Sequence, residues 1–114
     1  MTLKGFETLL KTCCKDVSHH KSKGGALPRI IYSETGRNYY YADDKAYRKT
    51  WDVGVHLFAD PRHDCEGIIE ALEGMFDEYM ITFDMEEINY GSIPADTADP
   101  AQDGVIHYHY KCEV

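Results

Sequence analysis

The sequence has no long apolar run, no excess of basic residues and no signal-peptide pattern. No stretch approaches the ~20 apolar residues that a membrane-spanning helix needs. The 20 acidic and 12 basic residues give a net charge of −8, which argues against a nucleic-acid-binding surface because phosphate contacts depend on Lys and Arg. Residues 1–6 lack the charged start and the apolar run of a signal peptide. We therefore expect a protein that is made and kept in a cytosol and has no membrane partner.

The sequence signatures of an active site are also missing. Gly24 and Gly25 precede an expected strand rather than a helix, which is the wrong context for a phosphate-binding loop. The cysteines do not have the C-x-x-C spacing of a zinc site, and all of them can be buried as small apolar residues. Cys65 lies on an apolar helical stripe, where a thiol is inert packing rather than a nucleophile. We therefore predict a protein that is not an enzyme and that needs no cofactor.

Apolar residues at helical spacing predict two helices. The first is expected at about 3–18, with Thr2 as its N-cap and with His19 and His20 as a solvated helix end. The second is expected to begin with Asp60 as its N-cap and Pro61 at the first helical position. Its apolar stripe consists of Cys65, Ile68, Ile69, Leu72, Met75, Phe76 and Tyr79.

Alternation of apolar and polar residues predicts the strands. A turn is expected around Gly36, and a change of parity near Glu86 predicts a β-bulge. The strands are expected at 29–32, 39–41, 47–59, 81–90 and 105–114. With 114 residues, the chain is predicted to form a single α+β domain over 1–114. In it, a mostly antiparallel β-sheet carries two α-helices packed on one face, and residues 28–114 supply the sheet and the second helix.

Three histidines are predicted to share the other face of the sheet. His107 and His109 are two residues apart on the last strand, so they project to the same side, and His56 has the matching parity on the long strand. Three imidazoles on neighbouring strands can bind zinc. The alternative is that they are solvated side chains, and we favour it because no H-E-x-x-H motif or cysteine pair accompanies them. We therefore predict no metal site.

The aromatic residues from Tyr39 to Trp51 are more numerous than one small core needs. Alternate residues among them must face outward, and exposed tyrosines are favoured at protein interfaces. The alternative is that they pack against the second helix. Residues 91–104 are polar and too long for an ordinary hairpin loop, so we expect a mobile loop that contacts a neighbour. The predicted interface residues are Tyr39, Tyr40, Tyr41, Tyr47, Asp96, Asp99 and Asp103.

Three segments of the sequence occur in the order of a known family pattern. LPRIIY at 27–32, YADDKAY at 41–47 and WDVGVHLF at 51–58 are followed by a Glu-rich helix and a Tyr-rich final strand. This pattern resembles the tail terminator, or head–tail joining, proteins of long-tailed bacteriophages and of prophages in Gram-positive bacteria. The resemblance covers about residues 27–114. The length of the loop at 91–104 and the histidine pair of the last strand depart from the family pattern.

The resemblance implies a structural virion component that has no catalytic residue. Such a protein forms a ring, commonly a hexamer, that caps the tail tube and joins it to the head. Its implied partners are copies of itself, the tail tube protein and a head-completion or connector protein, while DNA passes through without being specifically bound. The implied location is the head–tail junction of the virion, after synthesis in the host bacterial cytoplasm.

Other functions remain compatible with the sequence. A head-completion or connector protein of similar size has the same general features. A cytosolic metal- or ligand-binding α+β domain would use His56, His107 and His109. A small regulatory or inhibitor protein would bind one partner through its acidic surface.

Overall fold

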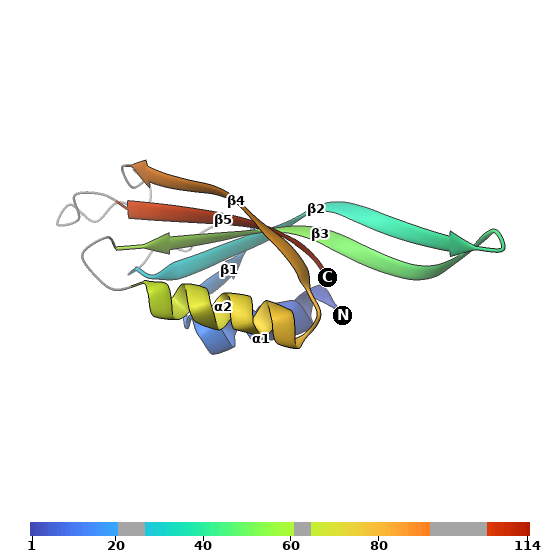
Figure 1. The fold of residues 1–114 in the computed structure, drawn as a ribbon, viewed down its shortest axis with the longest axis horizontal. Coiled ribbons are helices and arrows are strands. Elements are labelled where there is room, and N and C mark those ends of the chain that lie inside the picture. Colours follow the sequence, from blue (N-terminus) through green and yellow to red (C-terminus); the bar gives the residue numbers. More distant parts are fainter. Residues whose placement is uncertain (21–26, 61–64, 92–104) are drawn as a thin grey trace.

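The computed structural model describes residues 1–20, 27–60, 65–91 and 105–114. Along the chain, the elements are α1 (Leu3–Cys13), β1 (Val17–His19), β2 (Arg29–Ala42), β3 (Lys45–Ala59), α2 (Glu66–Glu78), β4 (Thr82–Gly91) and β5 (Val105–Glu113). The described strands form one sheet in the order β1-β2-β3-β5-β4. The β1–β2 pair is parallel, whereas the β2–β3, β3–β5 and β5–β4 pairs are antiparallel. Both helices lie on the same side of the sheet (Figure 1), which confirms the predicted α+β class.

The hydrophobic core lies between the helices and the sheet face toward them. Phe6 of α1 stacks on Phe76 of α2 with ring centroids 6.2 Å apart, and Phe76 meets the edge of Tyr110 of β5. Tyr110 is fully buried, and its hydroxyl donates a hydrogen bond to Glu73 Oε2 at 3.1 Å. The alternation predicted for β3 is confirmed from Val53 on, whereas Tyr47, of the same parity, is exposed. The buried side chains of this alternation in β3 and in the last ten residues are Val53, Val55, Leu57, Ala59, Ile106, Tyr108, Tyr110, Cys112 and Val114.

Helix α1 is shorter than the sequence pattern predicts. Its N-cap is Thr2 as expected, since the Thr2 side chain accepts a hydrogen bond from the Gly5 amide at 3.0 Å. The helix ends at Cys13, and Val17 belongs to β1, where it pairs with Ile30. The predicted extension to residue 18 is therefore wrong. Val17 packs against the core from a strand, so its apolar character did not require a helix.

Helix α2 begins later than predicted. Its first residue is Glu66 and Cys65 occupies the N-cap position, so the predicted start at Asp60 is wrong. Asp60 directly follows the end of β3 and is buried, and Pro61 lies outside the described residues. Tyr79 is the C-cap rather than part of the apolar stripe, and 49% of it is exposed.

Strands β2 and β3 form one long hairpin rather than three shorter strands. Gly36 does not form a turn: it follows a bulge in β2, where the pairing skips Thr35 between Glu34 and Gly36. The predicted division into strands at 29–32 and 39–41 is therefore wrong. The chain reverses at Asp43 and Asp44, whose φ angles of 52° and 62° are those of a two-residue hairpin turn.

The remaining described elements follow the sequence closely. The pairing of β4 with β5 shifts between Met85 and Glu87, which confirms the predicted bulge at Glu86. The interface residues predicted at Asp96, Asp99 and Asp103 lie outside the described residues, as does the loop at 92–104. Neither described helix is long and apolar enough to cross a membrane.

Candidate functional site

The β2–β3 hairpin extends well beyond the body of the molecule. Trp51 of β3 pairs with Val114 through two backbone hydrogen bonds of 2.7 and 2.9 Å, and β5 contributes no further pairing beyond that point. Residues 37–50 therefore form a two-stranded ribbon, which we call the arm. Figure 1 shows it reaching far past the helices, and it accounts for the molecular dimensions of 57 × 26 × 22 Å.

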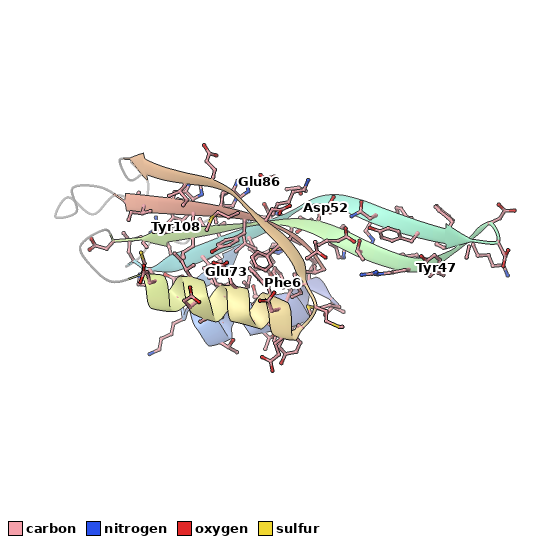
Figure 2. All side chains as sticks on the ribbon, viewed as in Figure 1. Phe6, Tyr47, Asp52, Glu73, Glu86 and Tyr108 are labelled. Atoms are coloured by element: carbon pink, nitrogen blue, oxygen red, sulfur yellow. The ribbon has the colours of Figure 1, made fainter. Side chains whose placement is uncertain are left out.

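The arm carries the four tyrosines predicted to form an interface. Tyr39, Tyr41 and Tyr47 are 52%, 64% and 68% exposed; Figure 2 shows Tyr47 near the tip, remote from the core. Tyr40 is partly buried, and its hydroxyl donates a hydrogen bond to Glu113 Oε1 at 2.7 Å, which raises the pKa of Tyr40. The alternative that these tyrosines pack against the second helix is wrong, because the arm projects away from it.

The charge of the arm is opposite to that of the remaining chain. Four basic and two acidic residues between 37 and 50 give the arm a net charge of +2, which leaves −10 for the rest of a chain whose total is −8. The guanidinium of Arg37 lies over the Trp51 ring at 4.1 Å and that of Arg48 lies over Tyr40 at 5.6 Å. These contacts hold cations against aromatic rings along an exposed ribbon.

An edge of the sheet offers complementary chemistry. Strand β4 is the outermost strand beside β5, so one side of its backbone has no strand partner among the described residues. Asp84, Glu86 and Glu87 are exposed on this strand. Met85 and Ile88 add apolar surface, being 36% and 49% exposed. This acidic and partly apolar edge can accept a basic, aromatic ribbon.

The structure brings His56, His107 and His109 together on the sheet face opposite the helices, as their parity predicted. The His56 ring lies 4.2 Å from that of His109 and 4.9 Å from that of His107. His56 Nδ1 and His107 Nε2 share a 2.7 Å hydrogen bond. A Cβ on Gly54 would lie 3.4 Å from both His56 Nε2 and His109 Nε2, so glycine leaves room for these rings.

Burial and repulsion between neighbouring imidazoles favour the neutral forms of His56 and His107. The pKa of His56 is lowered to about 4, first by burial and then by the neighbouring His109 and His107. Burial also lowers the pKa of His107, followed by the effect of His109, while Glu87 opposes the change. The prediction that these histidines are simply solvated is therefore wrong, since all three are partly buried.

A second histidine cluster was not expected from the sequence. His19 and His20 both approach the carboxylate of Glu34, at 2.7 and 3.2 Å. Both histidines are exposed, as predicted, but they do not form a helix end, because His19 ends strand β1. Glu34 is distant in the sequence and belongs to no recognisable motif with the histidines, so only the β1–β2 pairing reveals the cluster.

The thiols match their predicted role as packing groups. Cys14 and Cys112 are buried, and Cys13 and Cys65 are partly buried. Burial raises the pKa of Cys112 to about 12 and also raises that of Cys14. A thiol that stays protonated at neutral pH is a poor nucleophile.

A comparison of the chain with models of known protein families and with curated proteins finds no match.

Proposed function

We propose that this protein is a structural subunit that assembles head to tail, with the arm of one copy bound to the β4 edge of the next. The observation that carries this proposal is the arm, which extends past the helices and exposes three tyrosines and three basic residues, Lys45, Arg48 and Lys49. A two-stranded ribbon is marginally stable by itself. A binding partner would bury its aromatic surface and give it support.

The β4 edge is the partner surface that best fits the arm. Lys45, Arg48 and Lys49 supply positive charge on the arm, and the acidic residues of β4 supply the opposite sign. Tyrosines are favoured in the buried centre of interfaces, where Met85 and Ile88 can pack against them. The arm and the edge are different surfaces, so their contact is heterologous and generates a closed ring when the rotation between subunits closes.

The resemblance to tail terminator proteins supports the particular assembly that we propose. In it, a ring of these subunits caps the tail tube of a long-tailed phage and joins it to the head. The tail tube protein binds on one side, and a head-completion or connector protein binds on the other. A strongly acidic body favours passage of DNA without adhesion, because like charges repel.

Charge reversal tests the arm–edge contact. The variant K45E/R48E/K49E reverses the arm, and E86K/E87K reverses the edge. We expect each variant to lose self-association, and an equimolar mixture to recover it, because each arm then meets an edge of opposite sign. Sedimentation velocity over a range of concentrations, with and without purified tail tubes, measures the association.

The matched control is E66K/E70K, which makes the same change in charge on exposed positions of α2 and should assemble as the wild type does. Binding to tail tubes, compared with binding to DNA-filled heads that lack tails, separates a tail terminator from a head-completion protein. A wild-type chain that remains monomeric at every concentration and never binds tubes would contradict the proposal.

A further inference from the structure

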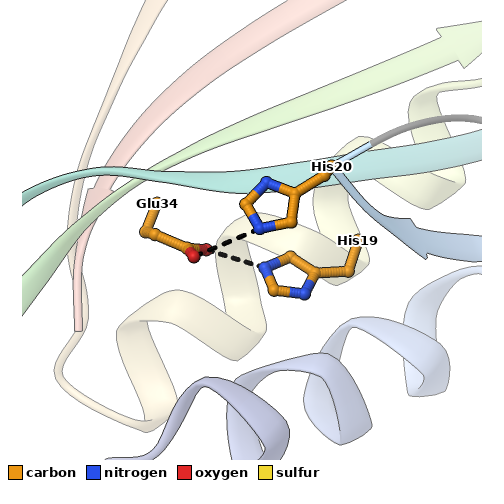
Figure 3. A group of neighbouring side chains, drawn as sticks. All are labelled: His19, His20 and Glu34. Atoms are coloured by element: carbon orange, nitrogen blue, oxygen red, sulfur yellow. Dashed lines mark hydrogen bonds and ion pairs between the residues drawn. The ribbon is translucent and has the colours of Figure 1, made fainter.

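We infer that His19, His20 and Glu34 form a binding site for a divalent transition metal ion such as Zn²⁺. Their ligand atoms, one imidazole nitrogen from each histidine and one carboxylate oxygen, all lie within 4.8 Å of one another. Figure 3 shows both imidazoles directed at the same carboxylate. Within residues 1–20, 27–60, 65–91 and 105–114, no other set of three ligating side chains meets so closely.

The backbone at His20 makes this convergence possible. Successive side chains of a strand normally point to opposite faces, so adjacent histidines do not ordinarily share a ligand. The φ angle of His20 is 69°, in the left-handed region that non-glycine residues rarely adopt. Its amide donates a hydrogen bond to the Tyr32 carbonyl at 2.8 Å, and its ring stacks on that of His19 with centroids 3.8 Å apart. Uncommon backbone geometry that aligns two imidazoles is a feature of functional sites.

The spacing of the three groups suits a single ion. His19 Nε2 lies 2.7 Å from Glu34 Oε2, and His20 Nε2 lies 3.2 Å from Glu34 Oε1. Two ligands that bind Zn²⁺ tetrahedrally at ~2.0–2.1 Å are separated by about 3.3 Å. Small side-chain rotations therefore place an ion between the three groups, with water in the fourth position.

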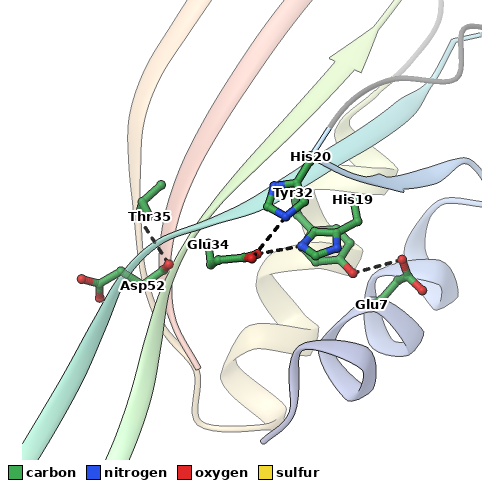
Figure 4. Close-up of polar contacts among 7 residues, drawn as sticks. All are labelled: Glu7, His19, His20, Tyr32, Glu34, Thr35 and Asp52. Carbon is green, nitrogen blue, oxygen red and sulfur yellow. Dashed lines mark hydrogen bonds and ion pairs between the residues drawn. The ribbon is translucent and has the colours of Figure 1, made fainter.

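Neighbouring side chains hold the cluster in place. The Tyr32 ring stacks on His19 at a centroid distance of 4.6 Å and an interplanar angle of 11°. The Tyr32 hydroxyl donates a hydrogen bond to Glu7 Oε1 at 3.0 Å, which ties the stack to α1 (Figure 4).

The donor set selects the class of metal. Imidazole nitrogens suit zinc and its first-row neighbours, whereas Ca²⁺ and Mg²⁺ prefer sites made of oxygen ligands. Two histidines and one glutamate are a known zinc donor set that leaves one position open for water. An ion bound here links the short edge strand β1 to β2, since the histidines lie at the end of β1 and Glu34 lies on β2.

The test is a zinc titration of untagged protein, because a histidine tag would bind the metal itself. Isothermal titration calorimetry with ZnCl₂ should give one ion per chain. His20→Asn and Glu34→Gln should each weaken the affinity at least tenfold. Asparagine is chosen because it tolerates the left-handed conformation of His20, so the variant keeps the fold. His107→Asn is the matched control and should bind as the wild type does.

Two further readouts separate a metal site from a structural contact. NMR resonances of the His19 and His20 imidazoles should shift on addition of zinc, while those of His56 and His109 stay in place. Zinc should raise the Tm of the wild type and not that of His20→Asn, because an ion stabilises the folded state that binds it. A wild type that binds no zinc at millimolar concentration overturns the inference. Loss of binding in His107→Asn, with retention in His20→Asn, also overturns it, because the ion would then bind on the open sheet face.

Discussion

Protonation of His56 is unfavourable in the folded protein, because its ring is partly buried beside two other imidazoles. Its ring lies between those of His107 and His109 and is partly buried. Because the pKa of His56 is lowered to about 4 in the folded protein, the unfolded chain takes up a proton at a higher pH than the folded chain does. Stability is therefore fully present above pH ~6.5 and decreases as the pH falls toward 4.

The variant His56→Gln tests this pH dependence. It removes the buried imidazole, so its free energy of unfolding should decrease less than that of the wild type between pH 7 and pH 4.5. Urea denaturation at several pH values measures the difference, and the effects of acid on groups that do not contact His56 cancel in the comparison. If the free energy of unfolding has the same pH dependence in the two proteins, the pKa of His56 is not lowered by folding.

The residues of the candidate sites differ in how far the sequence reveals them. His56, His107 and His109 could be placed together, because strand parity alone determines which face they occupy. The cluster at His19 could not be predicted, since it depends on the parallel pairing of β1 with β2 and on the positive φ of His20. Neither property leaves a local sequence pattern.

Among the elements, the arm is the one most clearly separable from the core. Residues 41–49 are all exposed, so removing them opens no cavity. Replacing residues 39–49 with Asn-Gly joins Asn38 to Thr50, which are paired partners across the ribbon, through a favoured two-residue turn. The variant also loses partly buried Tyr40 and its hydrogen bond to Glu113, so we expect the free energy of unfolding to fall by about 0.5–1.5 kcal/mol, the usual net contribution of one hydrogen bond.

Thermal and urea denaturation followed by circular dichroism measure the stability of the shortened protein. The far-UV signal of helices α1 and α2 should be retained, because Phe6, Phe76 and Tyr110, which pack the helices on the sheet, lie outside the arm. Failure of the shortened chain to fold would mean that the hairpin supports the sheet.

The sequence pattern predicts a helix or strand correctly when one side of that element is buried and the other is exposed. Strands β3 and β5 bury one face against the helices, so alternation revealed both. The arm has two exposed faces, and its polar and aromatic residues therefore lack a period that marks a strand. Gly36 then resembled a turn, although it follows a bulge and lies close to Asp52. The predicted end of α1 was wrong because an apolar residue such as Val17 can pack against the core from either a helix or a strand.

The whole molecule is an elongated particle with two unlike surfaces. Its radius of gyration is 15.4 Å, compared with about 13 Å for a compact domain of this length. In a head-to-tail assembly, each subunit uses its own arm once and its β4 edge once. A chain without an arm keeps only the edge, so it can accept one neighbour and cannot reach the next.

The shortened protein should therefore interrupt assembly of the wild type. When the two are mixed, the abundance of the closed oligomer should fall as the fraction of shortened chain rises, and incomplete assemblies should appear. Native mass spectrometry resolves these species. The control is the shortened chain carrying E86K/E87K, which lacks both surfaces and should leave wild-type assembly intact. Equal inhibition by the two shortened chains would contradict a head-to-tail contact.

The continuity of β2 and β3 from the tip of the arm into the sheet also has a mechanical consequence. A pull on the tip along the strands loads the hydrogen bonds between β3 and β5 in shear, so the bonds from Asp52 to Ala59 resist it together. A sideways pull acts on the ribbon at Trp51, where support from β5 ends. The hairpin is therefore strong under tension and compliant in bending, and a ring tethered by such arms would resist separation of its subunits while tolerating changes in its diameter.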